Sequence, residues 1–182
     1  MALEHAILVS LSERSGTGYQ LTRRFDRSIG YFWRATHQQI YRTLARMADQ
    51  GLVTFAEQPQ EGKPDKKVYS VTDTGRAFLS DWIAAAGTPT YLRDELAVKI
   101  RGATPGDLPA LVDEIRRHRD AHAERAELYR TMEKLDYSDP STLTGHALQQ
   151  FLVLRGGVVL EEGLVGWLDE VHSALSRDLT QP

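Results

Sequence analysis

The chain has 182 residues, 41% of them hydrophobic and 26% charged, with a net charge of −3, which indicates a globular protein rather than a disordered one. It contains no cysteine, which excludes a disulfide framework, a thiol nucleophile and a cysteine-ligated zinc site. Because it has neither the basic start and apolar run of a signal peptide nor roughly 18 uninterrupted apolar residues, we expect a cytoplasmic protein.

Three helices are predicted in the first part of the chain. Apolar residues at helical spacing predict one helix over residues 3–11 and a second over 19–29, separated by a turn at 16–18. A third helix follows Thr36, whose hydroxyl can cap a first-turn amide, and ends at Gly51, which tolerates the left-handed conformation of a helix stop. Its apolar face consists of Ile40, Leu44, Met47 and Ala48.

Beyond this helix the pattern changes to strand. Residues 52–57 and 67–72 predict a hairpin across the polar loop 58–66, and Thr72 or Asp73 can cap a further helix. The expected apolar face of that helix consists of Phe78, Leu79, Trp82 and Ile83. The order of three helices, two strands and a helix is that of a winged helix-turn-helix.

Glycine and proline in residues 84–90 mark a domain boundary, so we expect a winged domain over 1–86 and a helical domain over 87–182. Three further helices are predicted, over residues 93–101, 107–135 and 141–179. The last one carries apolar residues on more than one face, which a single neighbouring helix could not bury, and this implies a partner subunit. The expected fold class is therefore mainly α with a small β-hairpin, followed by an α-helical dimerisation domain.

The outer face of the third predicted helix is polar and basic. Gln38, Arg42 and Arg46 recur at spacings of four, and His37 and Gln39 occupy the first turn, where helix-turn-helix proteins usually place base-reading side chains. Glutamine and arginine can form bidentate hydrogen bonds to purine edges in the major groove. The alternative is an ordinary solvated helix face.

Lysines follow in the predicted hairpin loop. Lys63, Lys66 and Lys67 would form a cationic tip that can neutralise DNA phosphates. The charge distribution agrees, since residues 1–86 carry 11 Lys and Arg against 9 Asp and Glu, whereas residues 87–182 carry 11 against 16. A helix of this type followed directly by a basic hairpin favours binding to double-stranded DNA.

Several motifs of the chain occur together in one family. They lie at residues 18–21, 32–33, 40–44, 51–53 and 69–76, with looser ones at 93–99, 161–162 and 167–169. With these motifs the chain resembles the PadR family of bacterial transcriptional regulators. The resemblance implies a homodimer that is joined through the C-terminal helices and binds an inverted repeat in DNA. It also implies that the dimer represses transcription and that a small aromatic or lipophilic effector relieves this repression. It also implies that Tyr41 is a phosphate contact or a wall of the small core.

Two other clusters of side chains bear on function. Trp167, Phe151 and Tyr91 could wall an effector pocket, although aromatic residues of a domain core or dimer seam would give the same pattern. His118 and His122 have the spacing of two metal ligands on a helix, but the arginines around them would repel a dication, so we predict a solvated face without metal. These arginines are Arg116, Arg117, Arg119 and Arg125.

No set of residues supports catalysis, and no motif requires a cofactor, so we expect a protein that is not an enzyme. Two rival hypotheses remain beside a DNA-binding repressor. The winged domain could instead be a protein-interaction module, or the helical domain could make the protein a metal-responsive regulator.

Overall fold

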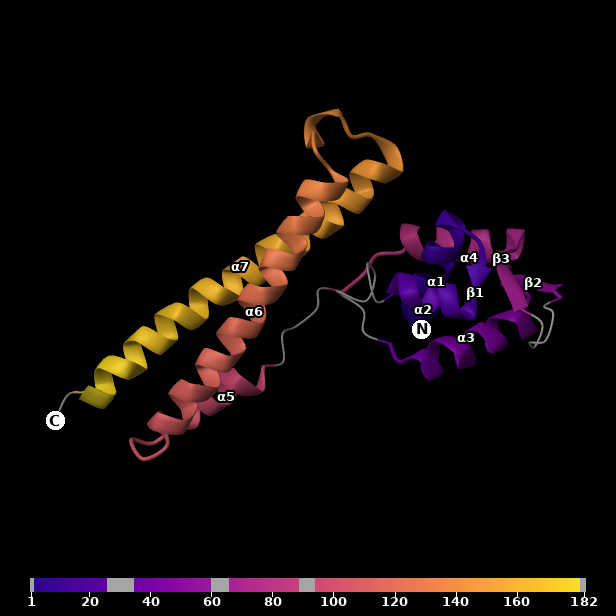
Figure 1. Ribbon diagram of the computed structural model, residues 1–182. Coiled ribbons are helices and arrows are strands. Elements are labelled where there is room, and N and C mark those ends of the chain that lie inside the picture. Colours follow the sequence, from indigo (N-terminus) through magenta and orange to yellow (C-terminus); the bar gives the residue numbers. More distant parts are fainter. Residues whose placement is uncertain (1, 26–34, 60–65, 89–93, 181–182) are drawn as a thin grey trace. The chain divides into compact units, whose positions relative to one another are not determined.

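The computed structural model describes residues 2–25, 35–59, 66–88 and 94–180 and divides into two compact units, Met1–Pro89 and Thr90–Pro182 (Figure 1). The first, here called the winged unit, contains α1 (Ala2–Glu13), β1 (Gly16–Thr17), α2 (Gly18–Phe25), α3 (His37–Asp49), β2 (Val53–Gln58), β3 (Lys66–Val71) and α4 (Asp73–Ala84). The second, the helical unit, contains α5 (Glu95–Gly102), α6 (Leu108–Asp136), the 3-10 turn η2 (Pro140–Thr142) and α7 (Gly145–Thr180). The predicted fold class is confirmed.

The sheet has three antiparallel strands in the order β1-β3-β2. The predicted hairpin is confirmed, with β2 and β3 paired from Val53 and Val71 at its base to Gln58 and Lys66. β1 was not predicted, because two residues are too few to show strand periodicity and residues 16–18 favoured a turn. β1 pairs with β3 on the side away from β2. Residues 26–29 of the second predicted helix lie outside the described residues.

The core of the winged unit joins all four helices to the base of the hairpin. The predicted apolar face of α3 is buried at Ile40, Leu44 and Met47, which pack with residues of α1, α2 and both long strands. Burial of this face fixes which side of α3 turns outward.

The predicted apolar face of α4 packs against α1 but is only partly buried. Leu79 is buried, but Ile83 is 66% exposed and Trp82 is 48% exposed. The reason is that α4 meets α1 along a narrow stripe, where Phe78 and Trp82 stack on the buried His5 imidazole at centroid distances of 4.9 and 4.3 Å.

In the helical unit α6 and α7 lie side by side and run antiparallel (Figure 1). His118 and His122 of α6 were predicted to be a solvated face, and for His122 this is wrong. His122 and Arg125 both contact the buried Glu161 of α7, and Arg119 Nε lies 2.9 Å from Asp169 Oδ1. The polar stretch therefore carries ion pairs across the helix seam, which hydropathy alone does not distinguish from solvation.

The last helix starts later than predicted. Asp139 caps η2, since its carboxylate accepts hydrogen bonds from Ser141 N at 3.1 Å and Ser141 Oγ at 2.6 Å, and α7 begins only at Gly145. Among the described helices, none combines the length and apolar character needed to cross a membrane.

Candidate nucleic-acid interface

Both ends of α3 are fixed by local hydrogen bonds. Thr36 Oγ1 accepts from Gln39 N at 3.2 Å while Gln39 Oε1 accepts from Thr36 N at 2.8 Å, a complete capping box. At the other end Gly51 has a φ of 70°, as predicted, and its N–H and that of Leu52 bond back to the last turn at 3.0 and 2.9 Å. The helix is thus held in place without a ligand.

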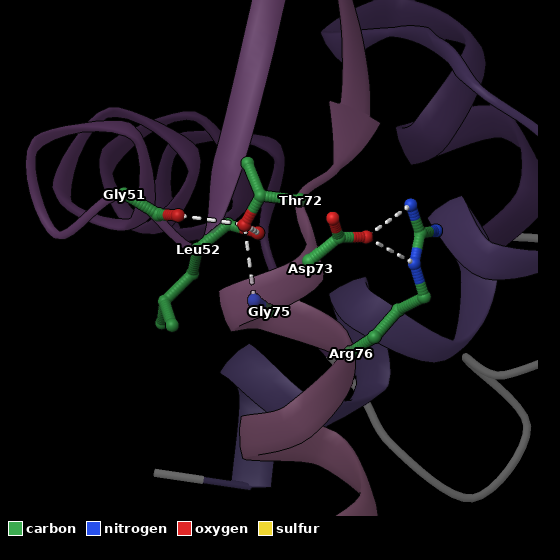
Figure 2. A network of polar contacts seen from close by, with 6 residues as sticks. All are labelled: Gly51, Leu52, Thr72, Asp73, Gly75 and Arg76. Atoms are coloured by element: carbon green, nitrogen blue, oxygen red, sulfur yellow. Dashed lines mark hydrogen bonds and ion pairs between the residues drawn. The ribbon is translucent and has the colours of Figure 1, made fainter.

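Thr72 ties the end of α3 to the beginning of α4 (Figure 2). Its hydroxyl lies 2.7 Å from Gly51 O and 3.1 Å from Leu52 O, and it accepts from Gly75 N at 3.0 Å as the cap of α4. A Cβ on Gly75 would lie 2.0 Å from Leu52 O, so only glycine permits this approach.

The side chains predicted to bind DNA from α3 fall into two groups. Gln38 and Arg42 are exposed, and within the described residues their side chains make no hydrogen bond or ion pair. Gln39 is exposed but its side chain belongs to the capping box, and Arg46 is paired with Glu4 of α1. His37 lies exposed in the first turn.

Tyr41 is 48% exposed, and its ring lies against the first residue of α2. A Cβ on Gly18 would come within 2.3 Å of that ring, so glycine is needed there. Burial, followed by the neighbouring Tyr41, raises the pKa of Tyr69 above its ordinary value. Tyr41 therefore packs against α2 while about half of its surface stays exposed.

The hairpin presents two described lysines in different settings. Lys67 Nζ lies 4.2 Å from the centre of the Phe55 ring and 3.9 Å from Glu57 Oε1, so its ammonium already has neighbours. Lys66 is exposed and makes no such contact within the described residues. Lys63 lies outside the described residues.

One exposed residue next to this face was not predicted. Tyr19 is 62% exposed in the first turn of α2, directly after the glycine that supports Tyr41. The helix start at residue 19 was predicted, and a second capping box, formed by Thr17 and Gln20, fixes it.

Of the three aromatic residues predicted to bind an effector, the two that the structure describes do not meet. Trp167 packs on the apolar cluster of α5, α6 and α7, whereas Phe151 contacts Tyr137 edge-on at 5.6 Å. On one straight helix these two residues are separated by about 24 Å. Tyr91 lies outside the described residues.

The two candidate metal ligands also turn to different partners. His118 Nε2 lies 3.9 Å from Glu114 Oε1 on its own helix, whereas His122 contacts Glu161 on α7. In the parts of the chain that the structure describes, no three His, Asp or Glu side chains gather closely enough to hold a metal ion.

Family models match both parts of the chain. The model of the transcriptional regulator PadR-like family matches residues 7–81, and that of the virulence activator alpha C-terminal region matches residues 92–176. The "probable transcriptional regulator Rv1176c" of Mycobacterium tuberculosis is 51% identical over 97% of this chain and 99% of its own length. The "negative transcriptional regulator PadR" of Bacillus subtilis is 30% identical over 97% and 98%.

Solved structures agree over nearly the whole chain. The Vibrio cholerae virulence activator AphA has a TM-score of 0.80 and 32% identity, covering 96% of this chain and 98% of its own. Bacillus subtilis PadR in complex with operator DNA has a TM-score of 0.78 and 27% identity, covering 96% and 99%. The same protein in complex with p-coumaric acid has a TM-score of 0.74 and 28% identity, covering 97% and 99%.

Proposed function

Since the chain belongs to the PadR-like family of transcriptional regulators, we propose that it binds operator DNA as a homodimer and represses transcription until a small molecule releases it. The family consists of regulators and not of enzymes. The observation that carries the proposal is α3, which is fixed at both ends and in the core while Gln38 and Arg42 remain exposed and uncommitted. The operator complex of the Bacillus subtilis relative supports the same use of the fold.

In this mechanism the N-terminal part of α3 enters the major groove, with His37, Gln38 and Arg42 toward the base edges. Tyr41 contacts a phosphate from the same helix, and the hairpin lysines contact phosphates beside it. These lysines are Lys63, Lys66 and Lys67.

The homodimer is supported by the apolar residues that α7 exposes. Leu152 and Val159 are seven residues apart, as are Val153 and Leu160, and all four are about half or more exposed. Such heptad-spaced pairs are typical of a helix that packs against another helix. A two-fold axis between α7 helices would give two winged units and hence an inverted-repeat operator.

We infer the direction of regulation and the type of effector from relatives. The Bacillus subtilis protein is named a negative regulator and has been solved with p-coumaric acid, which is small and aromatic. We expect a ligand of this kind to act on the helical unit and to change the separation of the two α3 helices, and thereby their fit to the half-sites. A reporter under the protein's own promoter should gain expression when the gene is deleted, and a loss of expression would identify an activator instead.

DNA binding is tested with a duplex from upstream of the protein's own gene. We expect salt-sensitive binding in a gel-shift assay, abolished by Arg42→Ala although the oligomeric state is unchanged. Arg117→Ala removes the same charge from the helical unit and should bind normally, because Arg117 lies outside the proposed interface. Unchanged affinity of Arg42→Ala would overturn the assignment, and a wild-type protein without salt-sensitive binding would favour a protein-interaction module.

A further inference from the structure

We infer that base discrimination rests on Gln38 and Arg42, whereas Arg46 is a structural residue that Glu4 withholds from the bases. The inference rests on the proposed function and divides a helix face that the sequence presents as uniform. It assigns Glu4, a residue of α1, a part in deciding which arginine of α3 can reach DNA.

A hydrogen bond and an ion pair tie the half-exposed Arg46 side chain to Glu4 of α1. Its Nε lies 3.1 Å and its Nη2 2.9 Å from the same carboxylate oxygen, Glu4 Oε1. The Glu4 side chain is only 10% exposed, so its charge requires this partner. A guanidinium that turned toward a base would leave a buried carboxylate unpaired, which disfavours base contact.

The position of Arg46 along α3 points the same way. Arg46 lies in the last turn of the helix, where α3 packs against α1, whereas base contacts in helix-turn-helix proteins come from the N-terminal part. Gln39 is in the N-terminal part, but its side-chain oxygen closes the capping box. Each of these two side chains therefore has a folding role that DNA contact would have to displace.

Gln38 and Arg42 carry no such commitment. They are one helical turn apart on the exposed side of α3, so they can address neighbouring base pairs. Glutamine matches the N6 and N7 atoms of adenine, and arginine matches the O6 and N7 atoms of guanine. Each half-site should therefore show an adenine preference and a guanine preference set by these two residues.

The test is in vitro selection from a duplex library with a randomised core, performed with the full-length protein and three variants. Gln38→Ala should lose the adenine preference, and Arg42→Lys should lose the guanine preference by on the order of tenfold while it keeps the charge. Arg42→Lys thereby separates base reading from phosphate attraction. The double variant Glu4→Gln/Arg46→Gln should select the wild-type motif at every position.

Folding is followed in parallel, because Arg46→Ala leaves the Glu4 carboxylate unpaired. We expect a lower melting temperature for Arg46→Ala and a partial recovery in the double variant, which keeps two neutral side chains that can hydrogen-bond. A changed base preference in the double variant, or an unchanged one in Arg42→Lys, would overturn the inference. If the wild-type protein selects no motif, the proposed function itself fails.

Discussion

Among the described residues, the winged unit gathers twelve apolar side chains into one buried cluster, whereas the main cluster of the helical unit contains four. The helical unit instead joins α6 to α7 by ion pairs and leaves Leu152, Val159 and Leu160 more than half exposed on α7. The winged unit therefore has the larger internal core, although Trp82 and Ile83 of α4 stay exposed, and the helical unit has the smaller one. The difference suggests that one unit folds as a self-contained module and that the other is completed by association.

The largest expected effect is on the apolar face of α7. Leu160→Asp should convert a dimer to a monomer, because it places a charge in the proposed seam, and operator affinity should fall roughly 10²- to 10⁴-fold as the two winged units lose their linkage. Analytical ultracentrifugation and a gel shift measure the two effects. Ser173→Asp adds the same charge at an exposed position of α7 and should remain dimeric; a monomeric control would contradict the proposed seam.

The winged unit should respond to loss of its core. Leu44→Ala removes a fully buried side chain and should lower the free energy of unfolding by about 2–5 kcal/mol, measured by urea denaturation. The dimer should persist, because the proposed dimer interface lies in the other unit. Ala45→Ser changes an exposed neighbour and should leave stability within about 0.5 kcal/mol. Dissociation of the Leu44→Ala protein would show that the units are not independent.

The ion pairs between α6 and α7 should differ in strength. Glu161 is 8% exposed and bonded to His122 and Arg125, so Glu161→Ala should cost about 2 kcal/mol of unfolding free energy. Its neighbour Glu162 pairs with Arg130 at a more exposed site, and Glu162→Ala should cost about 0–1 kcal/mol. Thermal unfolding compares the two, and equal losses would contradict the difference in burial.

A smaller effect is expected at the hairpin. Lys66→Ala should weaken binding to all duplexes alike and reduce the slope of log affinity against log salt by about one. Lys67→Ala should change that slope less, because Phe55 and Glu57 already engage its ammonium. Fluorescence anisotropy over a salt series measures both slopes, and a sequence-dependent loss for Lys66→Ala would place this lysine at a base.

The smallest effect is a titration. The hydrogen bond from Lys99 of α5 lowers the pKa of Glu114 on α6 below its ordinary value. The pair therefore stabilises the folded unit at pH values above the ordinary pKa of a glutamate, and this stabilisation is lost as the pH falls through the lowered pKa. In Lys99→Ala the pKa of Glu114 should rise toward the ordinary value. Carboxyl NMR measures the shift, and an unchanged pKa would show that another group sets it.

Much of the winged unit followed from the sequence because its signals are local. Thr36 and Gly51 delimit α3 through bonds within a few residues, and the alternating strands predict the β2–β3 hairpin. What periodicity did not predict depends on partners distant in sequence. β1 exists through pairing with Tyr69 and Val68, and the α4 face stays partly exposed because α1 offers only a narrow stripe.

The sequence predicted which residues of α3 could bind DNA. It did not predict which of them are already bonded to other parts of the fold and which are not. Gln38 and Arg46 share the same polar pattern, and only the fold brings Glu4 within 2.9 Å of Arg46. His122 illustrates the same limit in the helical unit, because its partner Glu161 lies on a helix 39 residues further along the chain. On α3 the pattern identifies which side chains turn outward, whereas long-range pairing determines which of them remain available.

Thr72 has a mechanical consequence for the regulator. Its hydroxyl bonds to Gly51 O after α3, to Leu52 O before β2 and to Gly75 N in the first turn of α4. α4 is the last described helix before the helical unit. A displacement that enters through α4 would therefore shift α3 and the hairpin together rather than one after the other. The winged unit would then behave as a rigid body, so that a signal alters how two such bodies are spaced and leaves the shape of each unchanged.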